Sequence, residues 1–168
     1  QPNTFYITPD WHRSSGVVLA KYDAPMVYKD LFVAQLERDQ PALQLTDTRS
    51  RHAGNIEPRW SPDGQWVWFA SERNSQGIFR LYAIRADGTS LQPRFHEAAE
   101  DRSPVPIENG TRIAFVRHPT TGPRLMIANP ETSTAQTLKD LSSLNVKEVQ
   151  SLDWTAFEGF AENAKPGG

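Results

Sequence analysis

Residues 57–95 hold four short apolar segments separated by turn signals, and this unit limits the chain to an all-β fold. Its first turn is Ser61-Pro62-Asp63-Gly64, where serine is a side-chain acceptor, proline fixes φ and glycine allows a positive φ, as in a type I turn. The aromatic and β-branched run 66–69 is too short for a helix and predicts a strand. Runs 78–84 and 91–95 flank the hairpin signal Asp87-Gly88. The unit is therefore predicted to form one four-stranded antiparallel sheet.

The unit recurs along the chain. A constant shift places Pro104 on Pro58, Gly110 on Gly64 and Phe115 on Phe69. Backwards, Leu31-Phe32-Val33 precedes a closing Leu43-Gln44-Leu45-Thr46 in the same way. We expect copies over about 4–50, 54–97 and 101–140, a partial fourth over 147–160, and a flexible tail over 161–168. A short helix fits only between Leu138 and Val149.

The pattern of the second copy resembles a known family. Trp60-Ser61-Pro62-Asp63-Gly64, an aliphatic-x-Phe strand, Leu81-Tyr82, Asp87-Gly88 and the closing Leu-x-Leu-Thr of the first copy are similar to the TolB-like, WD-repeat-like β-propeller repeats. The third copy departs from this pattern, with Glu108-Asn109-Gly110 for Pro-Asp-Gly and Pro106 in place of the tryptophan. The resemblance covers roughly residues 4 to 160. It implies an all-β propeller, or partial propeller, of about three to four four-stranded antiparallel blades around a central channel.

Alternation along the strands predicts which side chains lie between blades. We expect a shared set of repeat positions to be buried: Trp60, Val67, Phe69, Leu81, Ile113, Phe115 and Leu125. Trp66 and Trp68 share the opposite face of their strand. Their rings either fill a gap between adjacent blades or form an exposed aromatic patch that docks a partner.

The number of blades predicts association. Propellers usually close with four to eight blades, whereas this chain has residues for between three and four. Either its termini pair to close a small ring, or an open arc needs a protein partner or a second copy to cover apolar surface. The candidate partner-binding residues are aromatic: Trp66, Trp68, Phe5, Tyr6, Trp154, Phe157 and Phe160.

Composition excludes several other classes of function. With a formal net charge of −2 and scattered basic residues, the chain lacks the electrostatic pattern of a nucleic-acid-binding protein. Its apolar runs are too short for membrane insertion, and without cysteine it offers no disulfide or thiolate chemistry. The chain begins at Gln1 instead of methionine, which together with the TolB-like resemblance favours a periplasmic or extracellular location.

No catalytic, metal-binding or cofactor-binding residue is assigned from the sequence. A Gly-x-Ser-x-Gly elbow and a phosphate-binding glycine loop are both absent. Histidines and carboxylates lie in or beside predicted loops: His12, His52, His96, His118, Asp47, Glu97, Glu100, Asp101 and Glu108. A metal or hydrolytic pair at one mouth of the propeller stays an alternative to plain solvation. Asp63 and Asp87 are explained by their turns.

These observations predict a non-enzymatic interaction or scaffold module, an extracytoplasmic accessory subunit of a larger envelope complex. The alternative is a ligand-binding or substrate-gating propeller of a hydrolase or lyase. Fold alone does not decide between them, because propellers host many activities.

Overall fold

A computed structural model describes residues 4–23, 29–35, 39–48, 53–95, 99–132 and 134–142. These residues form three four-stranded antiparallel sheets with the strand orders β1-β2-β3-β4, β5-β6-β7-β8 and β9-β10-β11-β12. The first sheet holds β1 (Thr4–His12), β2 (Gly16–Asp23), β3 (Lys29–Ala34) and β4 (Leu43–Gln44). The second holds β5 (Asn55–Trp60), β6 (Trp66–Ser71), β7 (Arg80–Arg85) and β8 (Gln92–Pro93). The third holds β9 (Glu100–Ile107), β10 (Arg112–His118), β11 (Arg124–Asn129) and β12 (Thr134–Asp140).

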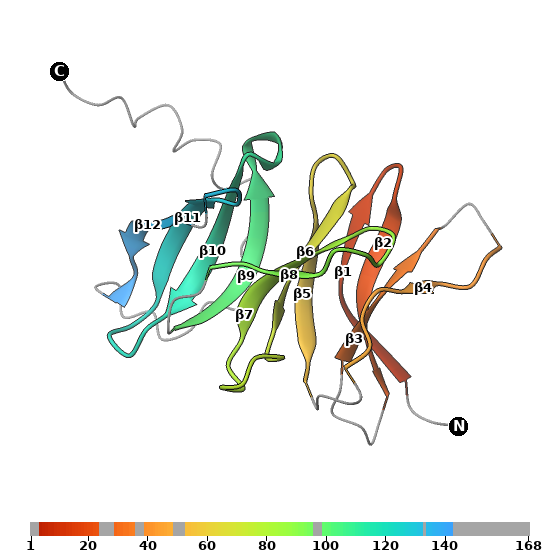
Figure 1. Cartoon of the computed structure of the whole chain (residues 1–168), viewed down its shortest axis with the longest axis horizontal. Coiled ribbons are helices and arrows are strands. Elements are labelled where there is room, and N and C mark those ends of the chain that lie inside the picture. Colours follow the sequence, from red (N-terminus) through yellow and green to blue (C-terminus); the bar gives the residue numbers. More distant parts are fainter. Residues whose placement is uncertain are drawn as a thin grey trace.

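The three sheets lie side by side as an open arc, with the second sheet between the first and the third (Figure 1). The first strand of each sheet contacts the first strand of the next, β1 with β5 and β5 with β9. These strands therefore form the inner side of the arc, and the other strands of each sheet follow outward from there. The all-β, partial-propeller fold class predicted from the sequence is confirmed.

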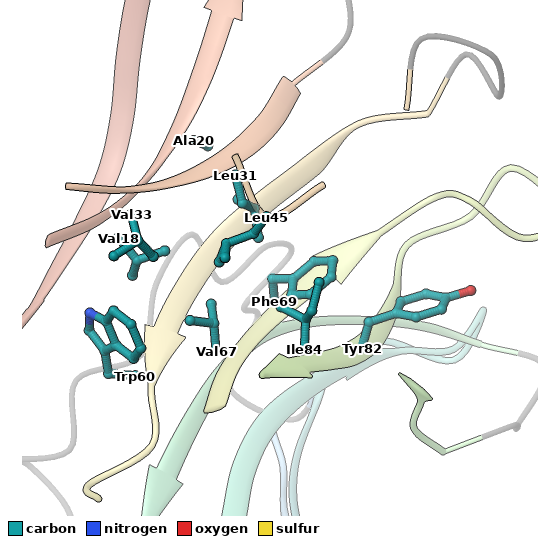
Figure 2. Packing of buried hydrophobic residues seen from close by; sticks show 10 residues of the cluster. All are labelled: Val18, Ala20, Leu31, Val33, Leu45, Trp60, Val67, Phe69, Tyr82 and Ile84. Carbon is teal, nitrogen blue, oxygen red and sulfur yellow. The ribbon is translucent and has the colours of Figure 1, made fainter. Parts of the chain in front are cut away.

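The first and second sheets pack through a layer of aliphatic and aromatic side chains (Figure 2). Val18, Leu31 and Val33 come from the first sheet and meet Val67 and Phe69 of β6. These side chains alternate along their strands with residues of the other face, as a pleated strand requires. Each fully buried aliphatic or aromatic side chain contributes roughly 1.5–3 kcal/mol relative to exposure.

A second layer joins the second and third sheets. Trp68 and Phe95 lie in one cluster with Ile113, Phe115 and Met126. The rings of Phe95 and Phe115 are stacked, with centroids 5.2 Å apart and planes 10° from parallel. The second sheet is thus packed on both faces, which explains the continuous apolar sequence of β6.

The predicted burial is confirmed, although Leu125, which pairs with Val116, lies on the outward side of the third sheet and not between blades. Every residue of the expected set is buried: Trp60, Val67, Phe69, Leu81, Ile113, Phe115 and Leu125. The turn before β6 also has the expected form, since the Gly64 amide donates to the Ser61 carbonyl at 2.8 Å. Where the third copy lacks Pro-Asp-Gly, a 3-10 turn over Glu108–Gly110 takes its place, with Asn109 at a φ of 55°.

Some expectations fall on other parts of the chain. The partial fourth copy over 147–160 and the tail over 161–168 lie outside the described residues. So does most of the stretch in which a short helix fits, although Leu138 itself belongs to β12. Within the described residues, no helix has the length and apolar character needed to cross a membrane.

Candidate functional site

The turns between the first two strands of each sheet hold the first two sheets together. In the β1–β2 turn, the His12 ring contacts the Pro62 carbonyl through Nε2 at 3.0 Å and the Ser15 hydroxyl through Nδ1 at 3.1 Å. The Ser15 hydroxyl donates to the Gly64 carbonyl at 3.0 Å. The indole of Trp60 donates from Nε1 to the Gly16 carbonyl at 3.1 Å. One turn of the first sheet therefore recognises the Trp-Ser-Pro-Asp-Gly segment of the second.

Gly64 is required at this contact. Its φ is +66°, and a Cβ added there would lie 2.3 Å from the Ser15 hydroxyl and 2.5 Å from the His12 ring. A side chain at this position would meet both a backbone penalty and a collision with the neighbouring sheet. The glycine of the motif thus serves both its own turn and the inter-sheet contact.

Each inner strand carries an irregularity at the same repeat position. Thr8, Glu57 and Ser103 have φ values of 48°, 55° and 52°, and each directly precedes a proline. The strand registers shift at the same places, between Ile7 and Asp10 in β1 and between Ile56 and Arg59 in β5. A positive φ in a residue with a Cβ is costly, so the surrounding structure must hold it. The repeat therefore includes a β-bulge on the inner side of the arc.

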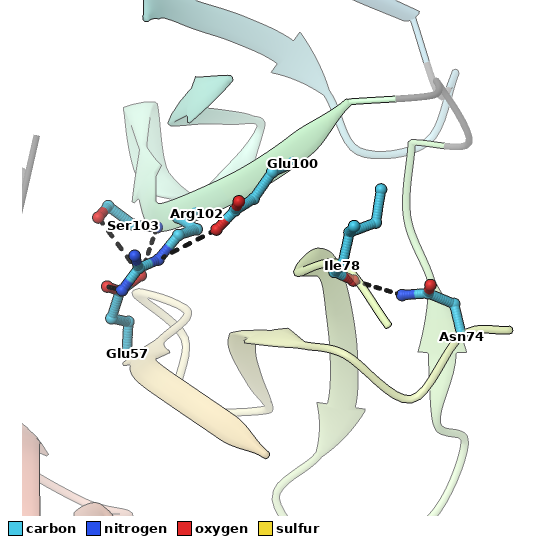
Figure 3. A network of polar contacts seen from close by, with 6 residues as sticks. All are labelled: Glu57, Asn74, Ile78, Glu100, Arg102 and Ser103. Atoms are coloured by element: carbon cyan, nitrogen blue, oxygen red, sulfur yellow. Dashed lines mark hydrogen bonds and ion pairs between the residues drawn. The ribbon is translucent and has the colours of Figure 1, made fainter. Parts of the chain in front are cut away.

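The bulges of the second and third sheets are linked by Glu57 (Figure 3). Its carboxylate accepts the Ser103 amide at 2.7 Å and the Arg102 Nη2 at 2.9 Å. Only 13% of the Glu57 side chain and 25% of the Arg102 side chain are exposed. A charge-assisted bond of this kind is stronger than one between neutral groups. Between the first two sheets, Asp10 has a related role and accepts the Trp60 amide at 2.7 Å.

A buried polar network lies at the opposite end of the first inter-sheet boundary. Asp30 accepts the hydroxyls of Thr46 and Thr48, both at 2.9 Å. The Asn55 amide donates to the Lys29 carbonyl at 2.8 Å and accepts Arg73 Nη2 at 2.6 Å. Because these groups satisfy one another, the network is explained as a structural connection between the sheets.

The outward side of the first sheet has no described element packed on it. We call this surface the open face, formed by Trp11, Val17, Leu19, Phe32 and Ala34. The register pairs Val17 with both Trp11 and Ala34, and Leu19 with Phe32, so these side chains share one side. Trp11 is 60% exposed and the other four are half-buried. Lys21 lies beside them, with its Nζ 5.5 Å from the centre of the Phe32 ring.

The outward side of the third sheet differs, because its apolar side chains are buried. Val105, Ile107 and Ala114 form a cluster, and Ala114 and Val116 are 1% and 0% exposed. Residues Ile113 and Phe115, which alternate with them, point to the second sheet. Among the described sheets, the open face is therefore the broad apolar side that is left uncovered.

The aromatic candidates predicted from the sequence do not form one surface. Trp68 is buried between the second and third sheets, with Arg94 5.5 Å from its ring centre. Trp66 is half-buried against the same cluster, with Arg85 5.2 Å away. The gap-filling interpretation therefore accounts for the position of both rings, while their contact with a partner stays a prediction.

The remaining aromatic candidates fall outside what the structure describes. Phe5 and Tyr6 lie in β1, but the structure does not describe their side chains. Trp154, Phe157 and Phe160 lie outside the described residues. Partner binding by these residues remains a prediction.

The histidines and carboxylates considered from the sequence have separate surroundings. Among the described residues, no group of three His, Asp or Glu side chains is placed to hold a metal. Asp101 forms a buried ion pair with Arg117 at 2.7 Å, and Glu108 pairs with Arg112 at 3.0 Å. His52, His96 and Glu97 lie outside the described residues.

The two turn aspartates have lowered pKa values. Partial burial raises the pKa of Asp63, but hydrogen bonds from the Ser61 hydroxyl at 2.5 Å and the Gln65 amide at 3.0 Å more than offset this, so it is lowered overall. The hydroxyl and amide of Thr89 lower the pKa of Asp87. Both aspartates act within their turns.

Sequence reasoning did not single out the open face. The available signal was the unbroken apolar character of 17–20 and 31–34, which is typical of strands packed on both sides. A sheet with one face in water shows alternation of apolar and polar residues instead.

Comparisons with known proteins give a consistent fold. No family model matches the chain. An uncharacterised protein of Agrobacterium fabrum is 33% identical over 75 residues, which is 45% of this chain and 24% of that protein. The chain therefore spans about a quarter of the length of the curated relative that it matches.

Solved structures of low sequence identity share the architecture. A putative TolB from Agrobacterium tumefaciens has a TM-score of 0.59 at 18% identity, over 82% of this chain and 61% of that chain. TolB from Acinetobacter baumannii has a TM-score of 0.63 at 17% identity, over 79% and 32%. A puromycin-hydrolysing peptidase of Mycobacterium tuberculosis has a TM-score of 0.64 at 15% identity, over 81% and 22%. The chain has the β-propeller fold of TolB-like structures, of which it matches a part.

Proposed function

We propose that this chain is a non-enzymatic protein-interaction module whose open face binds a further β-sheet. One observation carries the proposal: the first sheet has the sequence of a sheet packed on both sides, yet among the described residues only one of its sides is covered. Val18 and Val33 are buried against the second sheet, while Val17, Leu19 and Phe32 on the other side stay half-buried. Uncovered apolar sides of this size mark interaction surfaces or aggregation hazards.

The partner is identified by its chemistry. The five residues of the open face are apolar, and Lys21 lies beside them with its Nζ over the Phe32 ring. Within this chain, the same kind of surface is covered twice by another sheet, at both inter-sheet boundaries. A sheet of propeller type matches the open face in polarity, and we propose that a second copy of this chain supplies it. We expect about 1,000 Å² or more to be buried, the lower range for a specific interface.

The fold shared with TolB-like structures supports this proposal. Two of the similar structures are TolB proteins, of which the chain spans only part. We extend the proposal to an extracytoplasmic accessory subunit of a larger envelope complex. What supports this extension is the shared fold and the sequence resemblance of the second copy.

The experiment measures molecular mass by light scattering as a function of concentration. We expect the purified chain to associate and the Trp11→Lys variant to stay monomeric, because a charge introduced into an apolar interface is left unpaired. Leu138→Lys is the matched control: Leu138 is 43% exposed on β12, far from the open face, and its replacement should leave association unchanged. The Trp66→Ala variant tests the alternative in which Trp66 and Trp68 bind the partner.

A compact monomer at every concentration would contradict the proposal. Equal loss of association in the Trp11→Lys and Leu138→Lys variants would move the interface away from the open face.

A second candidate function is favoured by the likeness to peptidases. The chain covers 22% of the puromycin-hydrolysing peptidase, so the matched part is a propeller segment of a larger enzyme. A ligand-binding or substrate-gating role beside a hydrolase is tested by adding the purified chain to such a domain and measuring substrate selectivity.

A further inference from the structure

A cleft of about 630 Å³ lies at the turn end of the boundary between the first and second sheets. Its floor is apolar and comes from Val33, Trp60 and Ala86. Its walls come from the β1–β2 turn, the segment before β4 and the β5–β6 turn. The volume is within the range typical of small-ligand and peptide sites.

The rim of the cleft is made of amide side chains. Gln35, Gln40, Gln44 and Gln65 come from three separate segments of the chain and converge on it. Gln44 donates to the Thr46 carbonyl at 2.7 Å. No hydrogen bond is found for the other three side-chain amides in the part of the chain that the structure describes. Each can therefore offer two donors and one acceptor to a ligand.

The charge of the site is as informative as its polarity. No acidic or basic side chain is found among the described residues that line the cleft. A charged ligand would find no charged partner among these described residues, so we expect a neutral ligand. Leu43, which is 46% exposed, adds an apolar wall beside the floor.

These observations separate a peptide from a saccharide. A saccharide gains most from an exposed aromatic ring against its C–H face, but Trp60 is only 6% exposed and its indole N–H is already bonded to Gly16. A peptide needs alternating donors and acceptors for its main chain and an apolar recess for a side chain. Glutamine amides and the floor supply both.

We propose that this cleft binds an uncharged, extended peptide segment, with its main-chain amides on the glutamines and one aliphatic side chain over Val33 and Ala86. The site shares no residue with the open face. It therefore goes beyond the proposed function and does not depend on it.

The test is a titration of the ¹⁵N-labelled protein with acetyl-Ala-Leu-Ala-amide, followed by NMR. We expect the side-chain amide signals of Gln35, Gln40 and Gln65 and the backbone signal of Ala86 to shift together. Gln40→Glu and Gln65→Glu should each weaken binding about tenfold, since a carboxylate replaces the donors. Gln136→Glu on the exposed face of β12 is the matched control and should bind as the unmodified chain does.

Further probes check the stated chemistry. Acetyl-Ala-Asp-Ala-amide should bind about tenfold more weakly because its charge is unpaired, and the Trp11→Lys variant should bind normally. The proposal is overturned if the leucine peptide shifts none of these signals, if both glutamate variants bind it as well as the control does, or if maltotriose shifts them and the peptide does not. If the chain associates but does not bind the peptide, the cleft proposal fails and the open-face proposal is unaffected. If the chain binds the peptide but does not associate, the open-face proposal fails and the cleft proposal is unaffected.

Discussion

The two ends of the arc are built from similar strands but differ in how far their outward apolar side chains are exposed. At the third-sheet end, Ile107, Ala114 and Val116 point away from the second sheet and are buried. At the first-sheet end, the open face leaves Trp11 60% exposed. The strands at both ends have continuous apolar sequences, which is the pattern of a sheet covered on both sides. Among the residues that the structure describes, no layer covers this side of the first sheet, although its sequence is suited to one.

The largest expected effect separates a packed boundary from the open end. Phe115→Ala and Phe69→Ala should each lower the free energy of unfolding by roughly 3–5 kcal/mol, because both rings are fully buried. Phe32→Ala on the open face should cost only about 1 kcal/mol, since its ring is half-buried. Urea denaturation of the monomeric chain measures all three. Similar losses at Phe32 and Phe115 would mean that the open face is packed as tightly as the boundary between the second and third sheets.

The next effect tests how the first sheet is held to the second. Gly64→Ala should lower the free energy of unfolding by about 2–3 kcal/mol, from a positive φ and a collision with Ser15 and His12. Gly77→Ala is a matched control, with a φ of +63° and no atom within 4 Å of the added Cβ, and should cost about 1 kcal/mol. The difference between the two isolates the inter-sheet contact. Equal costs would show that the contact does not constrain the turn.

A smaller effect concerns the polar link between the second and third sheets. Glu57→Gln should cost about 1–2 kcal/mol of unfolding free energy, because the single amide oxygen can still accept the Ser103 amide while the bond from Arg102 is lost. Glu108→Gln, which breaks an exposed pair with Arg112, should cost less than about 1 kcal/mol. Thermal unfolding compares them. A Glu108 effect as large as that of Glu57 would contradict the assigned role.

The smallest effect is the pH dependence of the turn aspartate. The pKa of Asp63 is lower in the folded state than in the unfolded chain, where it is about 3.9. The stability that this carboxylate contributes is therefore complete above the unfolded pKa and is lost as the pH falls through the folded pKa. Asp63→Asn should therefore flatten the acid limb of stability against pH. Measuring unfolding free energies between neutral and strongly acidic pH checks this, and an unchanged acid limb would assign the dependence to other groups.

Much of the fold was accessible from the sequence. The Ser-Pro-Asp-Gly turn and the alternation in 66–69 predicted the strands and both core layers, because local turn chemistry and burial act together there. The bulges were not predicted, since Thr8, Glu57 and Ser103 carry side chains that disfavour a positive φ. Their conformations depend on neighbouring sheets, which no local pattern records.

The candidate sites were less accessible. The open face depends on which side of the first sheet meets the second, and the repeat pattern alone does not specify this. The cleft assembles Gln35, Gln40 and Gln65 from separate segments, each of which is an ordinary polar residue in sequence. Alternation along the strand places Trp66 and Trp68 on one face but does not show whether that face is exposed. In the structure, the boundary with the third sheet accounts for their positions.

The most direct measurement of the central claim is hydroxyl-radical footprinting of Trp11 over a concentration series of the purified chain, with Leu138 as an internal reference. For the purified chain alone, we predict that Trp11 becomes protected from labelling as the molecular mass rises, while the labelling of Leu138 stays constant. The claim that the open face binds a further sheet would be contradicted if the labelling rate of Trp11 did not change and the chain stayed monomeric at every concentration.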